Sequence, residues 1–445
     1  MKRMIQYLTS LFFIVCILLV SSCKQQEKHP VSYEGLIHDL NFQLTNAIKA
    51  DGFSPPVASR IYAYCNICLY ECAILGESNY ASLNGQLQGF SYSALQSTRT
   101  MDSRALTVNA FYYVAKEFIY DTLSLSLYID SLNKVLINEI EDDEKYTSSI
   151  AASRHISEAV ISYSRQDGYK EIKQMPLYEY GDSPSSYQAT PPNYYDAIEP
   201  NWALLKPFVL DSTSQFFEPF PIAFDTLPGS KFYLLNKAIY DTTKNLSKTF
   251  MDLALFWDCN PLTTINDEHN LLKVRQITPG GHWINIVKII GTQKNSSPTE
   301  LADVYLRVSL ALAEAFKVSW YSKYNTNLIR PETYINQYID KTWKPFIETP
   351  PFPEHNSGHA LISNAAAHTL AFFYGNQIEY TDNTNDPYGL EERKFSLITD
   401  ASAEASISRY YGGIHYYESI VQGENQGKEV AELLEARLIT LKSKF

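Results

Sequence analysis

Hydrophobic residues recur every three or four positions over most of the chain, which is the spacing that buries one face of an α-helix. The alternation that marks β-strands is scarce, and the helical spacing is clear over residues 37–50, 60–75, 105–118, 123–141, 232–257 and 299–320. Residues 174–228 interrupt it with nine prolines and many aromatic residues. A segment so rich in aromatics is unlike a disordered one. The pattern therefore predicts a mainly helical protein crossed by one long ordered loop.

The first 22 residues have the pattern of an export signal and not of a folded element. Two basic residues precede a short apolar run over residues 11–20, and small residues then lead to Cys23. This arrangement resembles a bacterial lipoprotein signal with cleavage before the cysteine, and the run is too short for a convincing transmembrane helix. We predict a signal peptide over residues 1–22, a lipid on Cys23 and a polar tether over residues 23–32. The protein would then be an exported lipoprotein of the outer membrane, attached to the membrane only by its lipid.

The chain is acidic, with 49 Asp and Glu against 37 Lys and Arg and a formal net charge of −12. Nucleic acid is therefore not an expected partner, because a phosphate backbone needs a basic surface. Any bound anion must be held by a local cluster of cations. Cys65, Cys68 and Cys72 fall on one face of a predicted helix. A zinc site there would need a fourth ligand from elsewhere, so buried apolar thiols are the default interpretation.

Three short motifs in the last third of the chain concentrate groups that bind oxyanions. They supply three cations, a serine, a glycine and two histidines: Lys323, Arg330, Ser357, Gly358, His359, Arg409 and His415. A tetrahedral oxyanion needs several charge-assisted donors, and an arginine fork matches its oxygens in pairs. Ser357 and Gly358 precede an apolar helical stretch, so the free N–H groups and the positive end of that helix would face the anion. One histidine could bond to the central atom while the other moves protons near neutral pH.

The order and spacing of these motifs, Lys-x6-Arg-Pro, Ser-Gly-His and Ser-Arg-x5-His, resemble the signature of the vanadium haloperoxidase and type 2 phosphatidic-acid-phosphatase superfamily. Other stretches, such as residues 279–283 and 349–354, are similar to its soluble Bacteroidetes-type haloperoxidase branch. The resemblance implies an all-α fold of packed helical bundles. It places an N-terminal helical region over residues 33–290 and a bundle that carries the oxyanion site over residues 291–445.

The resemblance also implies a role for each motif residue. The three cations, the serine and the glycine would hold vanadate, with His415 as its axial ligand and His359 as the acid–base residue. Vanadate would activate hydrogen peroxide for attack by a halide, giving hypohalous acid. Trp320 and Phe352 would line the halide side of the pocket, and His282 is a candidate for its mouth.

Phosphoryl transfer could use the same pocket, with His415 as the nucleophile and His359 as the acid. The superfamily's usual Asp four residues after the last histidine is Ser419 here. Because that carboxylate would orient a nucleophilic histidine, its absence weighs against a phosphatase. Glu314 and Glu404 are candidate carboxylate partners for the cations. We therefore predict a vanadate-dependent haloperoxidase that oxidises iodide or bromide. The alternatives are an acid phosphatase for soluble phosphate esters and a degenerate oxyanion-binding lipoprotein, and the oligomeric state stays open.

Overall fold

The computed structural model describes residues 30–93, 95, 100–261, 264–267, 270–273 and 276–442. The predicted signal peptide, Cys23 and most of the tether lie outside these described residues, so they stay predictions. Residues Tyr33–Phe445 form one compact unit. Helices dominate its described part, and the only strands there form two short hairpins, which confirms the predicted all-α fold class. No helix in this described part combines the length and the apolar character that a bilayer span requires.

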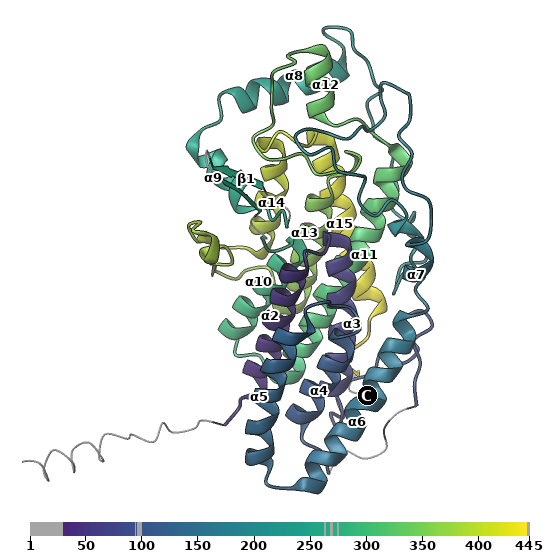
Figure 1. Ribbon diagram of the computed structural model, residues 1–445, viewed down its shortest axis with the longest axis vertical. Helices are drawn as coiled ribbons and strands as arrows, with labels where there is room; N and C mark the ends of the chain where they lie inside the picture. The colour runs from purple at the N-terminus through teal and green to yellow at the C-terminus, as the bar shows by residue number, and fades with distance from the viewer. Residues whose placement is uncertain are drawn as a thin grey trace, which may run out of the picture. The chain divides into compact units, whose positions relative to one another are not determined.

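Helix α3 (Pro55–Ala73) is the centre of the N-terminal group of helices, which lies in the lower part of Figure 1. It contacts α11 (Pro298–Thr326) and three helices of its own group, α2 (Tyr33–Asp51), α4 (Ser103–Ala115) and α6 (Asp143–Ser164), and the group is completed by α5 (Thr122–Ile140). Nearly every side chain of α3 is therefore buried, including the free thiols of Cys65, Cys68 and Cys72. Burial raises the pKa of the Cys65 and Cys72 thiols, so these groups pack as neutral apolar side chains.

A long loop joins the short helix α7 (Tyr169–Ile172) to α8 (Lys231–Lys244). Residues 174–228 contain one 3-10 turn, η1 (Trp202–Leu204), which packs on α11. The loop buries several large aromatic side chains, among them Tyr187, Trp202 and Phe208. The burial of these rings explains how a proline-rich segment stays ordered, since each ring removes a large apolar area from water.

The helical spacing over residues 232–257 corresponds to two helices. Helix α8 ends at Lys244, and Ser247 then caps α9 (Lys248–Phe256). The Ser247 hydroxyl accepts a hydrogen bond from the Phe250 amide at 3.4 Å. A serine at this place satisfies an N–H group at the start of a new helix, so the periodic stretch is divided into two helices.

Two antiparallel hairpins lie in the connections between helices. In one, β1 (Thr264–Asp267) pairs with β2 (Asn270–Lys273) so that Thr264 faces Lys273. In the other, β3 (Tyr380–Asp382) pairs with β4 (Arg393–Phe395) so that Tyr380 faces Phe395, and the turn η2 (Asp386–Tyr388) lies between the strands. The second hairpin contacts α10 (Pro279–Gln293) and α14 (Ile398–Tyr411), which brings its Asp382 towards the interior.

Helix α13 (Gly358–Tyr374) is the central helix of the C-terminal bundle. It packs against α10, α11, α14 and α15 (Tyr417–Arg437), as Figure 1 shows. Gly423 of α15 permits the close approach, because a Cβ atom there would lie 2.7 Å from the carbonyl oxygen of Ser357. This close packing fixes the position of the first turn of α13 between α11 and α15.

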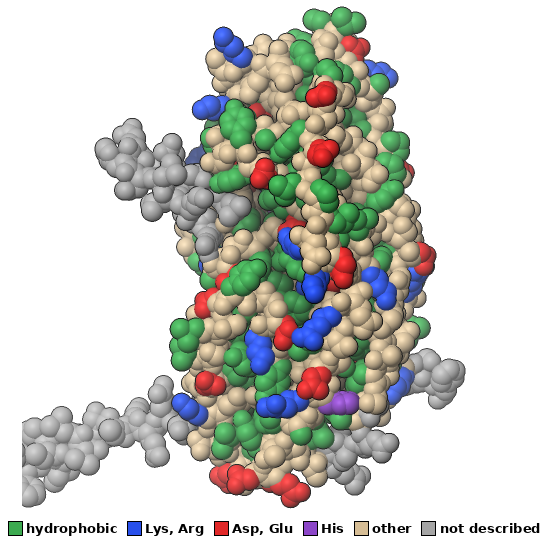
Figure 2. Space-filling model, turned by 45° about the vertical axis from the view of Figure 1, so that its right-hand side comes forward, with side chains coloured by type: hydrophobic (Ala, Val, Ile, Leu, Met, Phe, Trp, Pro, Cys, Tyr) green, Lys and Arg blue, Asp and Glu red, His purple; other side chains and the backbone are tan. Residues whose placement is uncertain are grey.

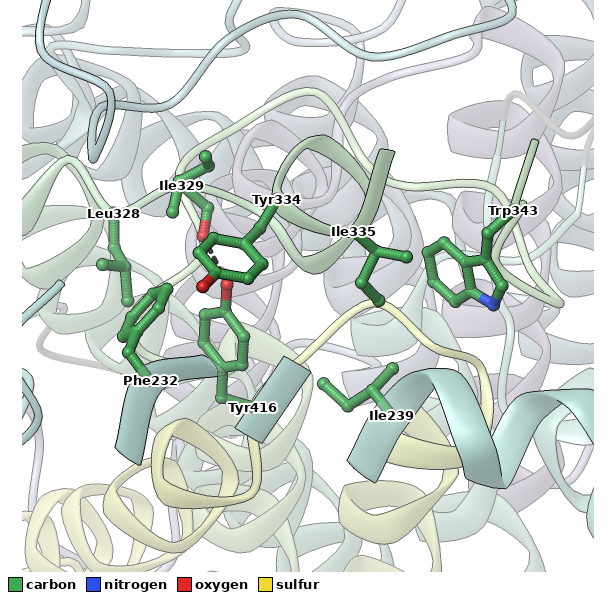
Figure 3. Packing of buried hydrophobic residues seen from close by; sticks show 8 residues of the cluster. All are labelled: Phe232, Ile239, Leu328, Ile329, Tyr334, Ile335, Trp343 and Tyr416. Atoms are coloured by element: carbon green, nitrogen blue, oxygen red, sulfur yellow. Dashed lines mark hydrogen bonds between the residues drawn. The ribbon is translucent and has the colours of Figure 1, made fainter. Parts of the chain in front are cut away.

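A cluster of aromatic and aliphatic side chains joins α8 and α12 (Pro331–Tyr338) to this bundle (Figure 3). Ile329 and Tyr416 belong to it, and the Tyr416 hydroxyl donates a hydrogen bond to the Ile329 carbonyl oxygen at 3.3 Å. These two residues are chain neighbours of Arg330 and His415. The cluster therefore fixes the backbone from which two of the predicted site residues extend. Its members are Phe232, Ile239, Leu328, Ile329, Tyr334, Ile335, Trp343 and Tyr416.

The surface carries charges of both signs. On the face shown in Figure 2, Lys and Arg side chains lie among Asp and Glu side chains, with hydrophobic side chains between them. Such a mixed face gives no extended basic strip for a phosphate backbone to follow, in keeping with the acidic composition.

Candidate active site

The three sequence motifs meet in space because each lies at the end of a helix. The cations come from the last turn of α11 (Lys323), the residue before α12 (Arg330) and the last turn of α14 (Arg409). Arg409 lines a cavity of about 100 Å³, whereas Lys323 and Arg330 are fully buried and do not line it. The start of α13 and the loop after α14 bring Gly358, His359 and His415 to the cavity wall, and Ser357, the residue before Gly358, is fully buried.

Arg330 has an unused hydrogen-bond donor in the interior. Its Nε donates to the Phe352 carbonyl oxygen at 2.8 Å, and its Nη1 donates to the Ile414 carbonyl oxygen at 2.9 Å. Its Nη2 is buried and has no hydrogen-bond partner among the described residues. Burial lowers the pKa of Arg330 to about 10, although Glu354 opposes this shift. A buried donor of this kind is costly until an acceptor arrives, which suits an oxyanion.

Lys323 is also held by neutral oxygen atoms. Its Nζ donates hydrogen bonds to the backbone carbonyl oxygens of Glu354 at 3.1 Å, Pro353 at 3.3 Å and Asn356. Burial lowers the pKa of Lys323 well below its usual value, and the charge of Arg330 adds to this effect. An anion bound nearby would favour the charged form of the amine.

Arg409 completes the set of cations. Its Nε donates to Ser408 Oγ at 2.9 Å, its Nη2 donates to the Ala254 carbonyl oxygen at 3.3 Å, and its Nη1 lies 3.8 Å from Asp258 Oδ1. Burial lowers the pKa of Arg409 while the Asp258 carboxylate opposes the shift. Desolvation thus works against the charge of all three cations, so an anion bound among them would be strongly favoured.

His415 is oriented by a carboxylate that the sequence did not reveal. Its Nδ1 lies 2.7 Å from Glu354 Oε1, which also accepts a hydrogen bond from the Tyr416 amide at 2.9 Å. The Nδ1–H therefore donates to Glu354, and Nε2 keeps its lone pair, 3.3 Å from Nη1 of Arg330. Burial lowers the pKa of His415 well below its usual value, and Arg330 and Lys323 add to the shift, so the ring is neutral.

Ser419 contacts the same carboxylate from the other side. Its Oγ donates to Glu354 Oε2 at 2.7 Å, and the serine is fully buried. Burial raises the pKa of Glu354 to about 7, while Arg330 and the Ser419 hydroxyl oppose the shift. Glu354 thus supplies the carboxylate that an Asp at position 419 would otherwise have supplied. The inference that His415 lacks a carboxylate partner is wrong, because the partner comes from the loop before α13.

The other two candidate carboxylates, Glu314 and Glu404, bind groups outside the site. Glu314 accepts hydrogen bonds from the backbone amides of the loop at Val209, at 2.6 Å, and pairs with Lys317 at 3.2 Å. Glu404 accepts a hydrogen bond from the Trp257 indole at 2.9 Å and pairs with Arg393. Neither contacts a site cation, so that suggestion is also corrected.

The start of α13 presents its first residues to the cavity. The Ser357 hydroxyl accepts a hydrogen bond from the Ala360 amide at 3.4 Å, and the Ser357 amide donates to the Ser419 carbonyl oxygen at 3.0 Å. A Cβ atom on Gly358 would lie 3.4 Å from Lys323 Cε, so glycine lets the helix start lie against the lysine. His359 is half-buried in the cavity wall, and burial, reinforced by Arg409, lowers its pKa well below the usual value.

Two aromatic rings form the apolar part of the wall. Trp320 and Phe352 both line the cavity, with ring centroids 5.0 Å apart, and the Trp320 indole donates to the Ile198 carbonyl oxygen at 3.1 Å. His282 lies deeper, fully buried, and is not among the residues that line the cavity. Its Nδ1 lies 3.4 Å from Cys259 Sγ, and Cys259 does line the cavity.

Comparisons with known proteins agree with this geometry. Residues 303–441 match the family model of the VCPO second helical-bundle domain. The crystal structure of the first bacterial vanadium-dependent iodoperoxidase is 36% identical, with a TM-score of 0.88 over 94% of this chain and 100% of that one. The holo form of a bacterial vanadium-dependent chloroperoxidase is 15% identical, with a TM-score of 0.64 over 87% of this chain and 94% of that one. The apo form is also 15% identical, with a TM-score of 0.65 over 86% of this chain and 95% of that one. At this identity the two structures show the shared fold alone. No curated protein matches the sequence. Because the iodoperoxidase is matched over its whole length, this chain belongs to the vanadium-dependent haloperoxidase family.

Proposed function

We propose that the protein oxidises iodide or bromide with hydrogen peroxide, using vanadate held in the cavity, and releases hypohalous acid. The observation that carries the proposal is the buried cation set around a neutral His415, with Arg330 Nη2 still lacking an acceptor. The structural relative with 36% identity is an iodoperoxidase, which supports iodide as the first substrate to test.

The donor set fits vanadate, a compact oxyanion. Lys323, Arg330 and Arg409 would hold its oxygens, helped by the residues at the start of α13, and His415 would ligate the metal through Nε2. When bound, vanadate supplies a Lewis acid that activates peroxide without changing its own oxidation state. The Glu354 carboxylate would keep the His415 Nδ1–H in place and so leave Nε2 free as the ligand atom.

The chain's own residues would then manage protons and water. His359 is neutral near neutral pH because its pKa is lowered, so its ring nitrogen can take a proton from an incoming peroxide and return it later. Trp320 and Phe352 would exclude water from one side of the cavity and offer a weakly hydrated surface to a large halide. Iodide, the most easily dehydrated of the three halides, should benefit most from such a wall.

A phosphatase remains a second candidate because of one observation. The hydrogen bond between Glu354 and His415 gives the histidine the carboxylate partner that a phosphohistidine mechanism uses, so Ser419 no longer argues against it. Turnover of a soluble phosphate ester would then use His415 as the nucleophile and His359 as the acid.

The two chemistries are separated by one panel of assays. Vanadate-loaded protein would be given peroxide with iodide, bromide or chloride, and metal-free protein would be given p-nitrophenyl phosphate. We expect vanadate-dependent oxidation of iodide and then bromide, with weak phosphate hydrolysis. Efficient hydrolysis without any vanadate-dependent halide oxidation would favour the phosphatase instead. Failure of both reactions would favour the third hypothesis, an oxyanion-binding lipoprotein without enzymatic activity.

We also propose that the mature protein is an exported lipoprotein with its lipid on Cys23, which lies outside the described residues. The supporting feature is the basic, apolar and small-residue pattern before this cysteine. The Cys23→Ala variant should accumulate unprocessed or appear in the soluble fraction. Unchanged membrane fractionation of a folded Cys23→Ala protein would contradict the lipid anchor.

A further inference from the structure

Three side chains that the oxyanion site does not use form a continuous polar chain at the cavity wall. Cys259 Sγ lies 3.4 Å from Nδ1 of His282, and Nε2 of His282 lies 2.7 Å from Oδ2 of Asp382. His282 and Asp382 are fully buried, whereas Cys259 lines the cavity and is 3% exposed. The order thiol, imidazole, carboxylate is that of an activated cysteine nucleophile.

The histidine cannot turn away from the sulfur. Its ring stacks on Trp257 with centroids 4.6 Å apart and an interplanar angle of 19°. Asp382 is fixed in turn, because its Oδ1 accepts hydrogen bonds from the Thr384 amide at 3.0 Å and from the Thr384 hydroxyl at 2.6 Å. With Nε2–H donating to Asp382, Nδ1 is left facing Cys259.

The charge state of His282 favours a thiolate at its side. Burial alone would lower the pKa of His282, but the Asp382 carboxylate and Cys259 outweigh it and raise the pKa to about 10. The ring is therefore an imidazolium at neutral pH, and its Nδ1–H points at the sulfur. An imidazolium partner is the usual means of stabilising a reactive thiolate.

The surrounding charges are few and mixed. Asp258 and Cys259 both interact electrostatically with Arg409, and Asp258 Oδ1 lies 3.8 Å from Arg409 Nη1. His359, which is neutral near neutral pH, is the other titratable group that interacts with His282. The cysteines of α3 differ, because burial raises the pKa values of Cys65 and Cys72 and neither thiol has an imidazole hydrogen-bond partner in the part of the chain that the structure describes.

We propose that Cys259 is a peroxide-reactive thiolate, activated by His282 and Asp382, whose oxidation state alters the wall of the active-site cavity. The sulfur attacks one oxygen of hydrogen peroxide, so an S–O bond forms while the O–O bond breaks. The departing hydroxide takes the proton from Nδ1 of His282 and leaves as water. Sulfur loses two electrons to the peroxide and becomes a sulfenic acid, which a small thiol can reduce again. The reaction needs neither vanadate nor halide, so it stands apart from the proposed function.

The test follows the oxidation state of each cysteine in the full mature chain without vanadate. The folded protein is exposed to dilute hydrogen peroxide, quenched with catalase, and denatured in N-ethylmaleimide, so that every remaining thiol is alkylated. Mass spectrometry then compares the Cys259 peptide with the peptide that carries Cys65, Cys68 and Cys72. We expect Cys259 to lose its alkylation at least about tenfold faster, and dithiothreitol to restore it. Equal rates for all four cysteines would overturn the proposal.

The pH profile and one pair of variants test the role of the imidazole. If the His282 imidazolium activates the sulfur as proposed, the rate in the native protein should be almost constant from about pH 6 to pH 9. Asp382→Asn should lower the rate at neutral pH about tenfold and make it rise with pH, as for an ordinary thiol with a pKa of about 8.5. Asp386→Asn, on the exposed turn of the same hairpin, is the matched control and should react like the native chain.

Each outcome decides the proposal. An Asp382→Asn protein that reacts as fast as the native one removes His282 and Asp382 from the activation. If that variant does not fold, the native profile decides alone, because a rate that climbs with pH up to about 8.5 would mean an ordinary thiol. Orthovanadate should slow the native reaction by occupying the cavity, and unchanged oxidation in saturating vanadate would place Cys259 outside it.

Discussion

Replacing Arg330 by lysine is the sharpest perturbation of the oxyanion pocket. In the native protein the Arg330 guanidinium donates to the Phe352 and Ile414 carbonyl oxygens, while its Nη2 has no partner among the described residues and could bind an anion. The Arg330→Lys variant keeps the positive charge but loses all of these donors. The buried lysine has only three donors on one nitrogen, so it cannot replace a planar guanidinium here. Anion binding and stability should both fall.

The structure sets the size of both effects. A hydrogen bond to a charged group contributes about 1.5–3 kcal/mol, so loss of the Nη2 donor should weaken vanadate binding roughly 10- to 150-fold. Each of the two carbonyl oxygens that loses its buried donor costs about 1–3 kcal/mol of unfolding free energy. Equilibrium dialysis with vanadium quantification gives the dissociation constant, and urea unfolding gives the stability.

Arg307→Lys is the control for stability alone. Arg307 is also buried, on α11, where it pairs with Asp303 at 2.9 Å and Glu435 at 2.7 Å. Unlike Arg330, which contacts the cavity-lining residues Phe352 and His415, it is bonded to residues that do not line the cavity. This variant should lose stability while it keeps the native vanadate affinity. The reasoning fails if Arg330→Lys binds vanadate as tightly as the native protein, or if Arg307→Lys weakens binding equally.

Two further predictions concern pH and buried charge. Ser419→Asp would place a second carboxylate against Glu354 Oε2, where the serine oxygen lies 2.7 Å away. Because two neighbouring negative charges raise the pKa of one carboxyl group, the free energy of unfolding of this variant should fall relative to that of Ser419→Ala as the pH rises from 4 to 8. Urea unfolding curves that coincide for the two variants at pH 8 would refute the contact. The pKa of His282 is about 10 in the fold against 6.5 in a free imidazole. Its contribution to stability should therefore be complete below pH 6.5 and decline towards pH 10 by at most about 1.4 kcal/mol per pH unit; a native stability curve no steeper than that of Asp382→Asn would contradict it.

The helices and the motif residues could be predicted because their signals are local. Apolar spacing reports which face of a helix is buried, and the motifs put their cations and glycine at helix ends, where a sequence pattern can be recognised. Helix α13 illustrates this, since Ser357 and Gly358 stand directly before the apolar stretch that forms it.

The partners of the histidines could not be predicted for the opposite reason. Glu354 meets His415 across 61 positions of sequence, and His282 meets Asp382 across 100. No periodicity links such residues. Glu354 and His415 lie in loops that meet through tertiary packing, and His282 meets Asp382 where β3 packs on α10. The one available hint was the position of Glu354, three residues before Ser357 in the loop that enters the site.

The most direct test of the account counts vanadium and activity in the same sample. Native and His415→Ala proteins would be loaded with vanadate, passed through gel filtration, and assayed for bound vanadium and for peroxide-dependent iodide oxidation. The account predicts about one vanadium per native chain with activity proportional to it, and neither in His415→Ala, because the variant lacks the only protein ligand proposed for the metal. Equal vanadium content and equal iodide oxidation in the two proteins would contradict it.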